Sequence, residues 1–358
     1  MVAKPHSSSF GQYRSSFGRI LIFCALVDKS VGAGKTMLDI PPRYMWGWSP
    51  PGPPTASGYC GSASVQSTAL YFGNWITQMA VRDTSGGHDA AHSILLGRDE
   101  DLPTPGTSVT HACAELKLDC SAWDYDAQPT PQHASFLSWA KDALDAGSPV
   151  IIGVYWVLDS DPDYDHIVPM IGYEEGESGG GSGKGGAVFL NDFHANATRR
   201  YDISDFVSSR RDCSVADDMV PADDDGRVYE WCLPSMVDYG VIVKGNADAG
   251  GELLRTQLVA LSSWSEPDYS EEDELGETPV RMSATVRVTG LETGSSYVLL
   301  RYDDPSAVPD RAFLAGGGFV EKIPFTAEAT NHAHAVTFMS NSTTLFRCVR
   351  APPGLAGR

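Results

Sequence analysis

Two short apolar segments separated by a glycine-rich loop constrain the fold most strongly. Residues 166–173 (HIVPMIGY) and 187–192 (AVFLND) are runs typical of buried strands. The sequence between them, EEGESGGGSGKGG, predicts an exposed flexible loop. We therefore expect an antiparallel hairpin in which Tyr173 faces Ala187.

This register makes a prediction about chemistry-bearing side chains. It places His166 opposite His194, with Asp192 diagonal on the same face, at a backbone spacing of roughly 7–8 Å. Asn191 then points to the other face. A slip of one residue would exchange Asn191 and Asp192, so the choice of Asp192 depends on the register.

A helix is predicted to begin at Cys60 in the sequence GYCGS. Val65, Ala69, Phe72 and Ile76 recur at helical spacing, which predicts one buried face between residues 60 and 76. Six prolines in residues 41–54 require an extended approach to this helix. The small residues around Cys60 predict an exposed thiol in the first turn.

A second helix is predicted over residues 132–146, where Phe136, Leu137, Ala140 and Leu144 share one face and Gly147 ends the pattern. The run VIIGVYWVL, residues 150–158, then predicts a further buried strand.

After about residue 245 the pattern changes to short alternating segments. Residues 283–291, 295–303, 334–340 and 343–350 predict strands of a β-sandwich, with no amphipathic helix after residue 280. The stretch VTGLETGSSYVLLRYD resembles the part of a fibronectin type III domain where a turn leads into a tyrosine-bearing strand.

The length of 358 residues fits about two domains. The net charge of −20 disfavours binding to nucleic acid or to anionic membranes. Lys4, Arg14 and Arg19 precede the apolar run 20–27, which predicts a secretory signal peptide over residues 1–33. The alternative is a buried strand, and the run is too short to span a membrane.

Seven cysteines agree with an exported protein. Cys113 with Cys120 and Cys213 with Cys232 are the pairings nearest in sequence, although the connectivity stays open and Cys348 is left over. The sequons at Asn196 and Asn341 predict a glycoprotein.

Three motifs offer rival functions. GAGKT at residues 32–36 is similar to the end of a phosphate-binding loop, but Lys29 replaces its first glycine and prolines follow too soon for a helix. The acidic runs 159–165 and 222–226 could ligate calcium, and solvated loops are the simpler explanation. HDAAH at residues 88–92 has the histidine spacing of the zinc-hydrolase motif H-E-x-x-H, but its acidic residue is the shorter aspartate.

The candidate site follows from what a thiol nucleophile requires. The thiolate is the reactive form, and the N-terminus of a helix lowers the pKa of a cysteine placed there. A histidine must act as base and acid, and a carboxylate or amide must orient it. Cys60, His166 and Asp192 provide these groups.

The order of these residues resembles the papain-like cysteine peptidases, closest to the double-glycine leader peptidase-like branch. The resemblance covers about residues 58–194 and implies Cys60 as nucleophile, His166 as general base and acid, and Asp192 as the orienting residue. It implies an α+β fold in which the cysteine helix packs on an antiparallel sheet. We expect a peptidase domain over residues 34–245 and a small β-sandwich over residues 246–358.

The predicted protein is a secreted thiol hydrolase of peptide or protein substrates, with no cofactor, no metal ion and no membrane span. The sandwich is a candidate surface for glycan or protein contact. The family's oxyanion glutamine would fall at Pro54, which has no donor. Alternatives are therefore an inactive papain-like scaffold, or an enzyme that passes the acyl group to an amine, as transglutaminases and ligases do.

Overall fold

The computed structural model describes residues 34–43, 59–85, 96–97, 107–155, 164, 166–176, 186–192, 197–203, 206–208, 232–261 and 281–352. Across these residues the chain is α+β, with mostly antiparallel sheets and few helices. The predicted signal peptide, residues 1–33, lies outside them.

The larger sheet has seven strands in the order β3-β10-β4-β5-β6-β7, and β1 also pairs with β5. All its pairings are antiparallel. The strands predicted at residues 150, 166 and 187 are confirmed as β4, β5 and β6. The bounds are β1 Lys35–Met37, β3 Leu118–Ala122, β4 Val150–Val154, β5 His166–Glu174, β6 Ala187–Asp192, β7 Ala197–Asp202 and β10 Gly240–Asn246.

The predicted hairpin register is wrong next to the glycine-rich loop. Ala187 pairs with Glu174 instead of Tyr173, and a bulge between Met170 and Gly172 then shifts the register by one residue. Beyond the bulge Met170 pairs with Leu190, which is the pairing that the sequence predicted. The bulge places two residues of β5 opposite one residue of β6, and this restores the predicted register beyond it.

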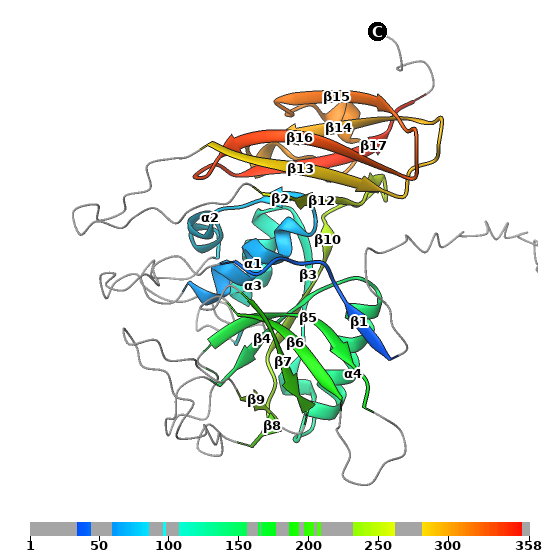
Figure 1. Ribbon diagram of the computed structural model, residues 1–358. Coiled ribbons are helices and arrows are strands. Elements are labelled where there is room, and N and C mark those ends of the chain that lie inside the picture. The colour runs from blue at the N-terminus through cyan, green and yellow to red at the C-terminus, as the bar shows by residue number, and fades with distance from the viewer. Residues whose placement is uncertain are drawn as a thin grey trace, which may run out of the picture.

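Helix α1, Cys60–Leu70, differs from the predicted amphipathic helix because all of its residues are buried. Figure 1 shows α1 between the seven-stranded sheet and the upper pair of sheets. Small residues allow this close approach on both sides, and hydroxyl groups bond to nearby carbonyls, as Thr68 does to Ser64 at 3.0 Å. The helix ends before Ile76 because Gly73, with φ +78°, turns the chain into strand β2.

Helices α3 and α4 pack against the larger sheet, and α2 packs against α1. Helix α4 has the predicted buried face and ends before Gly147, whose φ is +81°. The bounds are α2 Gln78–Asp83, α3 Thr107–Glu115, α4 His133–Asp145 and α6 Phe313–Gly316, with 3₁₀ turns η2 Tyr125–Ala127 and η5 Pro305–Ala307. The one-turn helix α6 was not predicted.

The C-terminal strands form two antiparallel sheets, as the alternating segments predicted. One has five strands in the order β11-β17-β14-β15 with β2 added at β17, and the other is β12-β13-β16. The bounds are β2 Asn74–Trp75, β11 Leu253–Leu254, β12 Thr256–Val259, β13 Arg281–Thr289, β14 Ser296–Tyr302, β15 Glu321–Thr326, β16 Asn331–Met339 and β17 Thr344–Arg350; a separate parallel pair consists of β8 Phe206–Val207 and β9 Leu233–Pro234.

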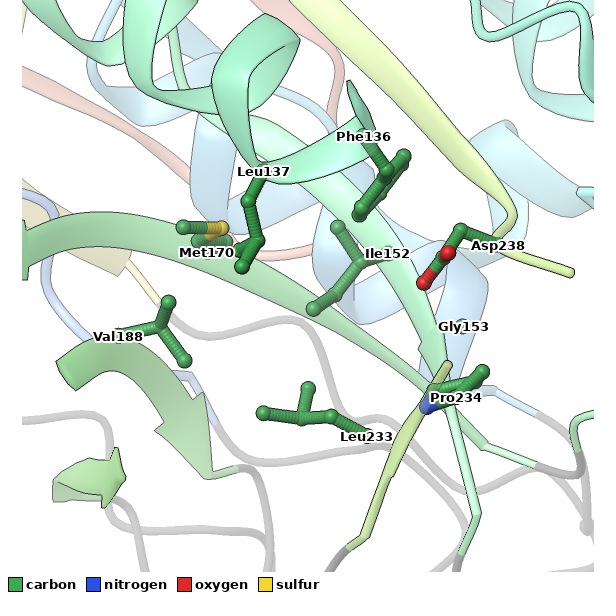
Figure 2. Close-up of a pocket in the computed structure, with 9 residues that line it drawn as sticks. All are labelled: Phe136, Leu137, Ile152, Gly153, Met170, Val188, Leu233, Pro234 and Asp238. Atoms are coloured by element: carbon green, nitrogen blue, oxygen red, sulfur yellow. The ribbon is translucent and has the colours of Figure 1, made fainter. Parts of the chain in front are cut away.

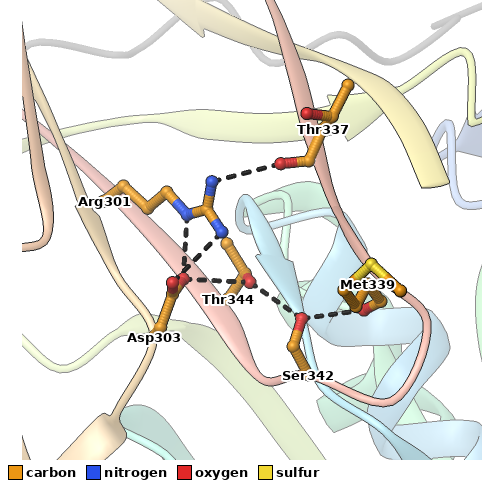
Figure 3. A network of polar contacts seen from close by, with 6 residues as sticks. All are labelled: Arg301, Asp303, Thr337, Met339, Ser342 and Thr344. Carbon is orange, nitrogen blue, oxygen red and sulfur yellow. Dashed lines mark hydrogen bonds and ion pairs between the residues drawn. The ribbon is translucent and has the colours of Figure 1, made fainter. Parts of the chain in front are cut away.

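Two polar arrangements stabilise these sheets. The hydroxyl of Tyr297 accepts a hydrogen bond from the backbone N–H of Glu292 at 2.8 Å, which is the geometry of a tyrosine corner. Arg301 binds Asp303 through two nitrogens, at 2.8 and 3.1 Å, and donates to the carbonyl of Thr337 at 3.1 Å (Figure 3). Because Arg301 lies in β14 and Thr337 lies in β16, this side chain joins the two sheets.

The two parts of the chain each contribute residues to both hydrophobic clusters. Leu70 and Trp75, from the N-terminal part, pack in the cluster that fills the sandwich. Leu300 and Val349, from the sandwich, pack in the cluster of the larger sheet. Strand β2 pairs with β17, so the sandwich is completed by a strand from outside the predicted C-terminal domain.

Candidate active site

Cys60 is the first residue of α1, and Tyr59 is the N-cap. The first turn contains no acidic residue, so no carboxylate of the helix neutralises its positive end. The predicted exposure of Cys60 is wrong, because only 6 % of the residue is accessible. Burial follows from the position of α1 between two layers of sheet. The thiol is not part of a disulfide.

His166 is the first residue of β5 and pairs with Val154 of β4. It is buried, with 1 % of its surface accessible. The hydroxyl of Ser64, one turn after Cys60, lies 2.8 Å from the carbonyl oxygen of Cys60 and 3.3 Å from that of Ile167. The first turn of α1 therefore lies against the start of β5, next to the residue that follows His166.

The third predicted residue, Asp192, ends β6 and pairs with Ala197 of β7. Its side chain lies outside the described part of the structure. The neighbouring Asn191 is fully buried and its amide is engaged: Nδ2 donates to the carbonyl of Ile40 at 3.1 Å, and Oδ1 accepts from Thr198 at 2.8 Å. These bonds give Asn191 a structural role, and the role of Asp192 stays a prediction.

The side chain of Gln66 makes structural hydrogen bonds. Its Nε2 donates to the carbonyl of Ile76 at 2.9 Å, and its Oε1 accepts from Gln78 at 3.1 Å. Gln66 therefore links α1 to α2, and the position that the family gives to its glutamine, Pro54, lies outside the described residues.

A positively charged side chain that the sequence did not predict, Arg82, lies near the start of α1. The guanidinium of Arg82 lies 4.1 Å from the ring centroid of Tyr59, and Arg82 is 6 % accessible. The hydroxyl of Tyr59 donates to the sulfur of Met79 at 2.9 Å. No sequence pattern indicated this contact, since it depends on the packing of α2 against α1.

The other described cysteines have separate roles. Cys113 of α3 and Cys120 of β3 form a disulfide, as one of the two nearest pairings. Cys232 is also disulfide-bonded, and its predicted partner Cys213 lies outside the described residues. Cys348 keeps its thiol, and burial raises its pKa to about 12, which makes this sulfur unreactive.

The described residues of GAGKT agree with the rejection of a phosphate-binding loop. Lys35 and Thr36 lie in strand β1, and the described residues 38–43 that follow contain no helix. The ammonium of Lys35 lies over the ring of Phe189 at 4.4 Å, and the hydroxyl of Thr36 donates to Asp145 at 2.8 Å.

The metal motifs are not tested in the same way. Residues 88–92 and 222–226, and all of 159–165 except Tyr164, lie outside the described segments. Within those segments no three His, Cys, Asp or Glu side chains are grouped to hold a metal ion.

Comparison with protein families, with curated proteins and with solved structures finds no match to this chain. No helix in the described segments is long and apolar enough to cross a membrane.

Proposed function

We propose that the chain is a secreted papain-like cysteine peptidase, with Cys60 as nucleophile, His166 as base and acid, and Asp192 as the orienting residue. The contact of Ser64 with the carbonyl of Ile167 carries this proposal, because it brings the helix start that bears Cys60 to the strand start that bears His166. These are the two positions that thiol catalysis in this fold requires.

In the proposed reaction the thiolate of Cys60 attacks the peptide carbonyl carbon and displaces its π electrons onto oxygen. The leaving amine takes a proton from the His166 imidazolium, and a thioester remains. Water then gives a proton to His166, attacks the thioester and restores the thiolate. The N-terminal amides of α1 favour the anionic sulfur and the oxyanion.

Export is part of this proposal and is supported by two observations. The Cys113–Cys120 disulfide is typical of proteins that mature in an oxidising compartment. Asn341 lies exposed in the turn between β16 and β17, where its sequon is accessible to glycosylation.

Iodoacetamide labelling tests the nucleophile, and Cys348 is the internal control because it is a second buried thiol in the same chain. We expect Cys60 to be alkylated at least about a hundred times faster than Cys348 at neutral pH. Cys60→Ala should abolish peptide cleavage while Cys348→Ala keeps it. Equal labelling of both thiols, or cleavage by Cys60→Ala, would contradict the proposal.

An inactive scaffold of the same fold is the second candidate. It is favoured by the low accessibility of Cys60 and His166, and by Pro54 at the oxyanion position. An electrophilic thiol probe separates the two, since a scaffold would leave Cys60 unmodified in the folded protein. Product masses in the presence of an added amine distinguish hydrolysis from acyl transfer.

A further inference from the structure

A small cavity of about 10 Å³ lies between helix α4 and the larger sheet (Figure 2). Its lining is apolar except at one position. Figure 2 shows the carboxyl group of Asp238 at the wall of the pocket, near Ile152 and Phe136. The lining also includes Leu137, Met170 and Leu233.

One oxygen of the Asp238 carboxyl group is buried without compensation. The residue is 2 % accessible, and its Oδ2 has no hydrogen-bond partner among the described residues. Burial raises the pKa of this carboxyl to about 8. No charged side chain in the described part of the chain contributes to that change, and Asp238 is the one titratable residue in the described lining.

The backbone around Asp238 holds the start of α4. The backbone N–H of Gln132 donates to the carbonyl of Met236 at 3.1 Å, and that of His133 donates to Ser235 at 3.4 Å. In return, the N–H of Asp238 donates to Oε1 of Gln132 at 3.2 Å. Hydrogen bonds in both directions therefore join segment 235–238 to the start of α4.

Other titratable groups near this segment lie outside the cavity lining. Nδ1 of His133 lies 3.2 Å from the carbonyl oxygen of Ser235. Tyr239 follows Asp238 in the chain, and its ring centroid lies 4.7 Å from those of Tyr125 and Tyr164. None of these groups supplies a positive charge to the carboxyl of Asp238.

We propose that Asp238 is a proton-controlled latch: the neutral carboxyl lets segment 235–238 close on helix α4, and loss of its proton releases the segment. An isolated carboxylate in an apolar site is strongly unfavourable. The cavity is near the lower limit for a single water, which needs at least two polar partners and would find one carboxyl here. Hydration of Oδ2 in the ionised group therefore requires the segment to move outward.

This latch is independent of Cys60 chemistry and can be tested on the full chain by hydrogen exchange. Amide protection of the first turn of α4 is compared at about pH 6 and about pH 9.5, after correction for intrinsic exchange. We expect wild-type protection to fall by at least about tenfold at the higher pH, from proton linkage. Asp238→Asn should show no such fall.

Asp142→Asn is the matched control, since it removes an exposed carboxylate from α4 itself and should behave as wild type. Equal pH dependence in Asp238→Asn and wild type would overturn the proposal. Carbon NMR of the Asp238 carboxyl in the wild-type chain provides a second measurement that needs no variant. A titration midpoint below about pH 5, near an ordinary aspartate, would also overturn it.

Discussion

Ser64 and Ile167 are joined by a hydrogen bond of 3.3 Å although 103 residues separate them in the chain. The same hydroxyl lies 2.8 Å from the carbonyl of Cys60. One side chain thus fixes the start of α1 relative to the start of β5, which is where the proposed nucleophile and base lie.

Ser64→Ala should therefore impair chemistry more than stability. We expect about 1 kcal/mol less free energy of unfolding, and about a tenfold slower alkylation of Cys60 as the two segments lose their alignment. Thr68→Val is the control, because Thr68 bonds only to carbonyls of its own helix. It should lower stability by a similar amount and leave the alkylation rate unchanged; equal rates in all three proteins would contradict the prediction.

The sandwich should not be separable from the larger sheet. A fragment ending at Asn246 loses the strand that pairs with β2 and exposes Leu70 and Trp75. We expect it to unfold without a cooperative urea transition, whereas the intact chain unfolds in one transition. A sharp transition in the fragment, with native near-ultraviolet circular dichroism, would show that the boundary near residue 245 separates independent domains.

Arg347 is a buried cation at the junction of the two parts. Burial lowers its pKa to about 9, and Nη1 donates to Oδ1 of Asn74 at 2.6 Å while Nη2 donates to the carbonyl of Lys117 at 3.3 Å. Asn74→Ala should cost about 3 kcal/mol of unfolding free energy, because it removes an acceptor from a buried charge.

The double variant Asn74→Leu, Arg347→Met tests the same interaction by removing both of its partners. It removes the charge together with its acceptor, so we expect it to be more stable than Asn74→Ala alone. Urea denaturation of the wild type, Asn74→Leu, Arg347→Met and the double variant measures the coupling. Strict additivity of the two single effects would refute the assigned interaction.

The sandwich should lose stability in mild acid through His332. Its ring stacks on Phe325 at 3.9 Å between centroids, and burial, with a contribution from His334, lowers its pKa below 6.5. The unfolded chain then binds more protons than the folded one, so this stabilisation is complete above about pH 6.5 and is lost as the pH falls.

Melting temperatures between about pH 5 and about pH 8 measure this effect. His332→Phe keeps the stacking and should flatten the acid side of the profile. His111→Gln, at an exposed position of α3, should retain the wild-type profile. A profile that is unchanged by His332→Phe would exclude this residue as the source.

Local patterns were sufficient for several elements. Strands β5 and β6 and helix α4 follow from apolar runs and from a stripe at helical spacing, and the strand segments of the sandwich follow from alternation. Each of these signals depends on neighbours in the chain. The positions of Cys60 at a helix start and His166 at a strand start were predicted for the same reason.

The burial of that helix start was not predictable. Small residues around Cys60 indicate exposure in a loop, but in α1 they permit contact with sheets on both sides. The register of β6 against β5 was likewise not predicted next to the loop, because it changes at a bulge between Met170 and Gly172.

The amino-acid sequence by itself determined which segments become helices and strands, because backbone preference and apolar spacing act over a few residues. Only the tertiary structure decided that α1 is enclosed on all sides, that β2 completes the C-terminal sheet, and that Asp238 faces an apolar cavity. These outcomes depend on contacts between segments far apart in the chain, whose free energies appear only when the layers pack together.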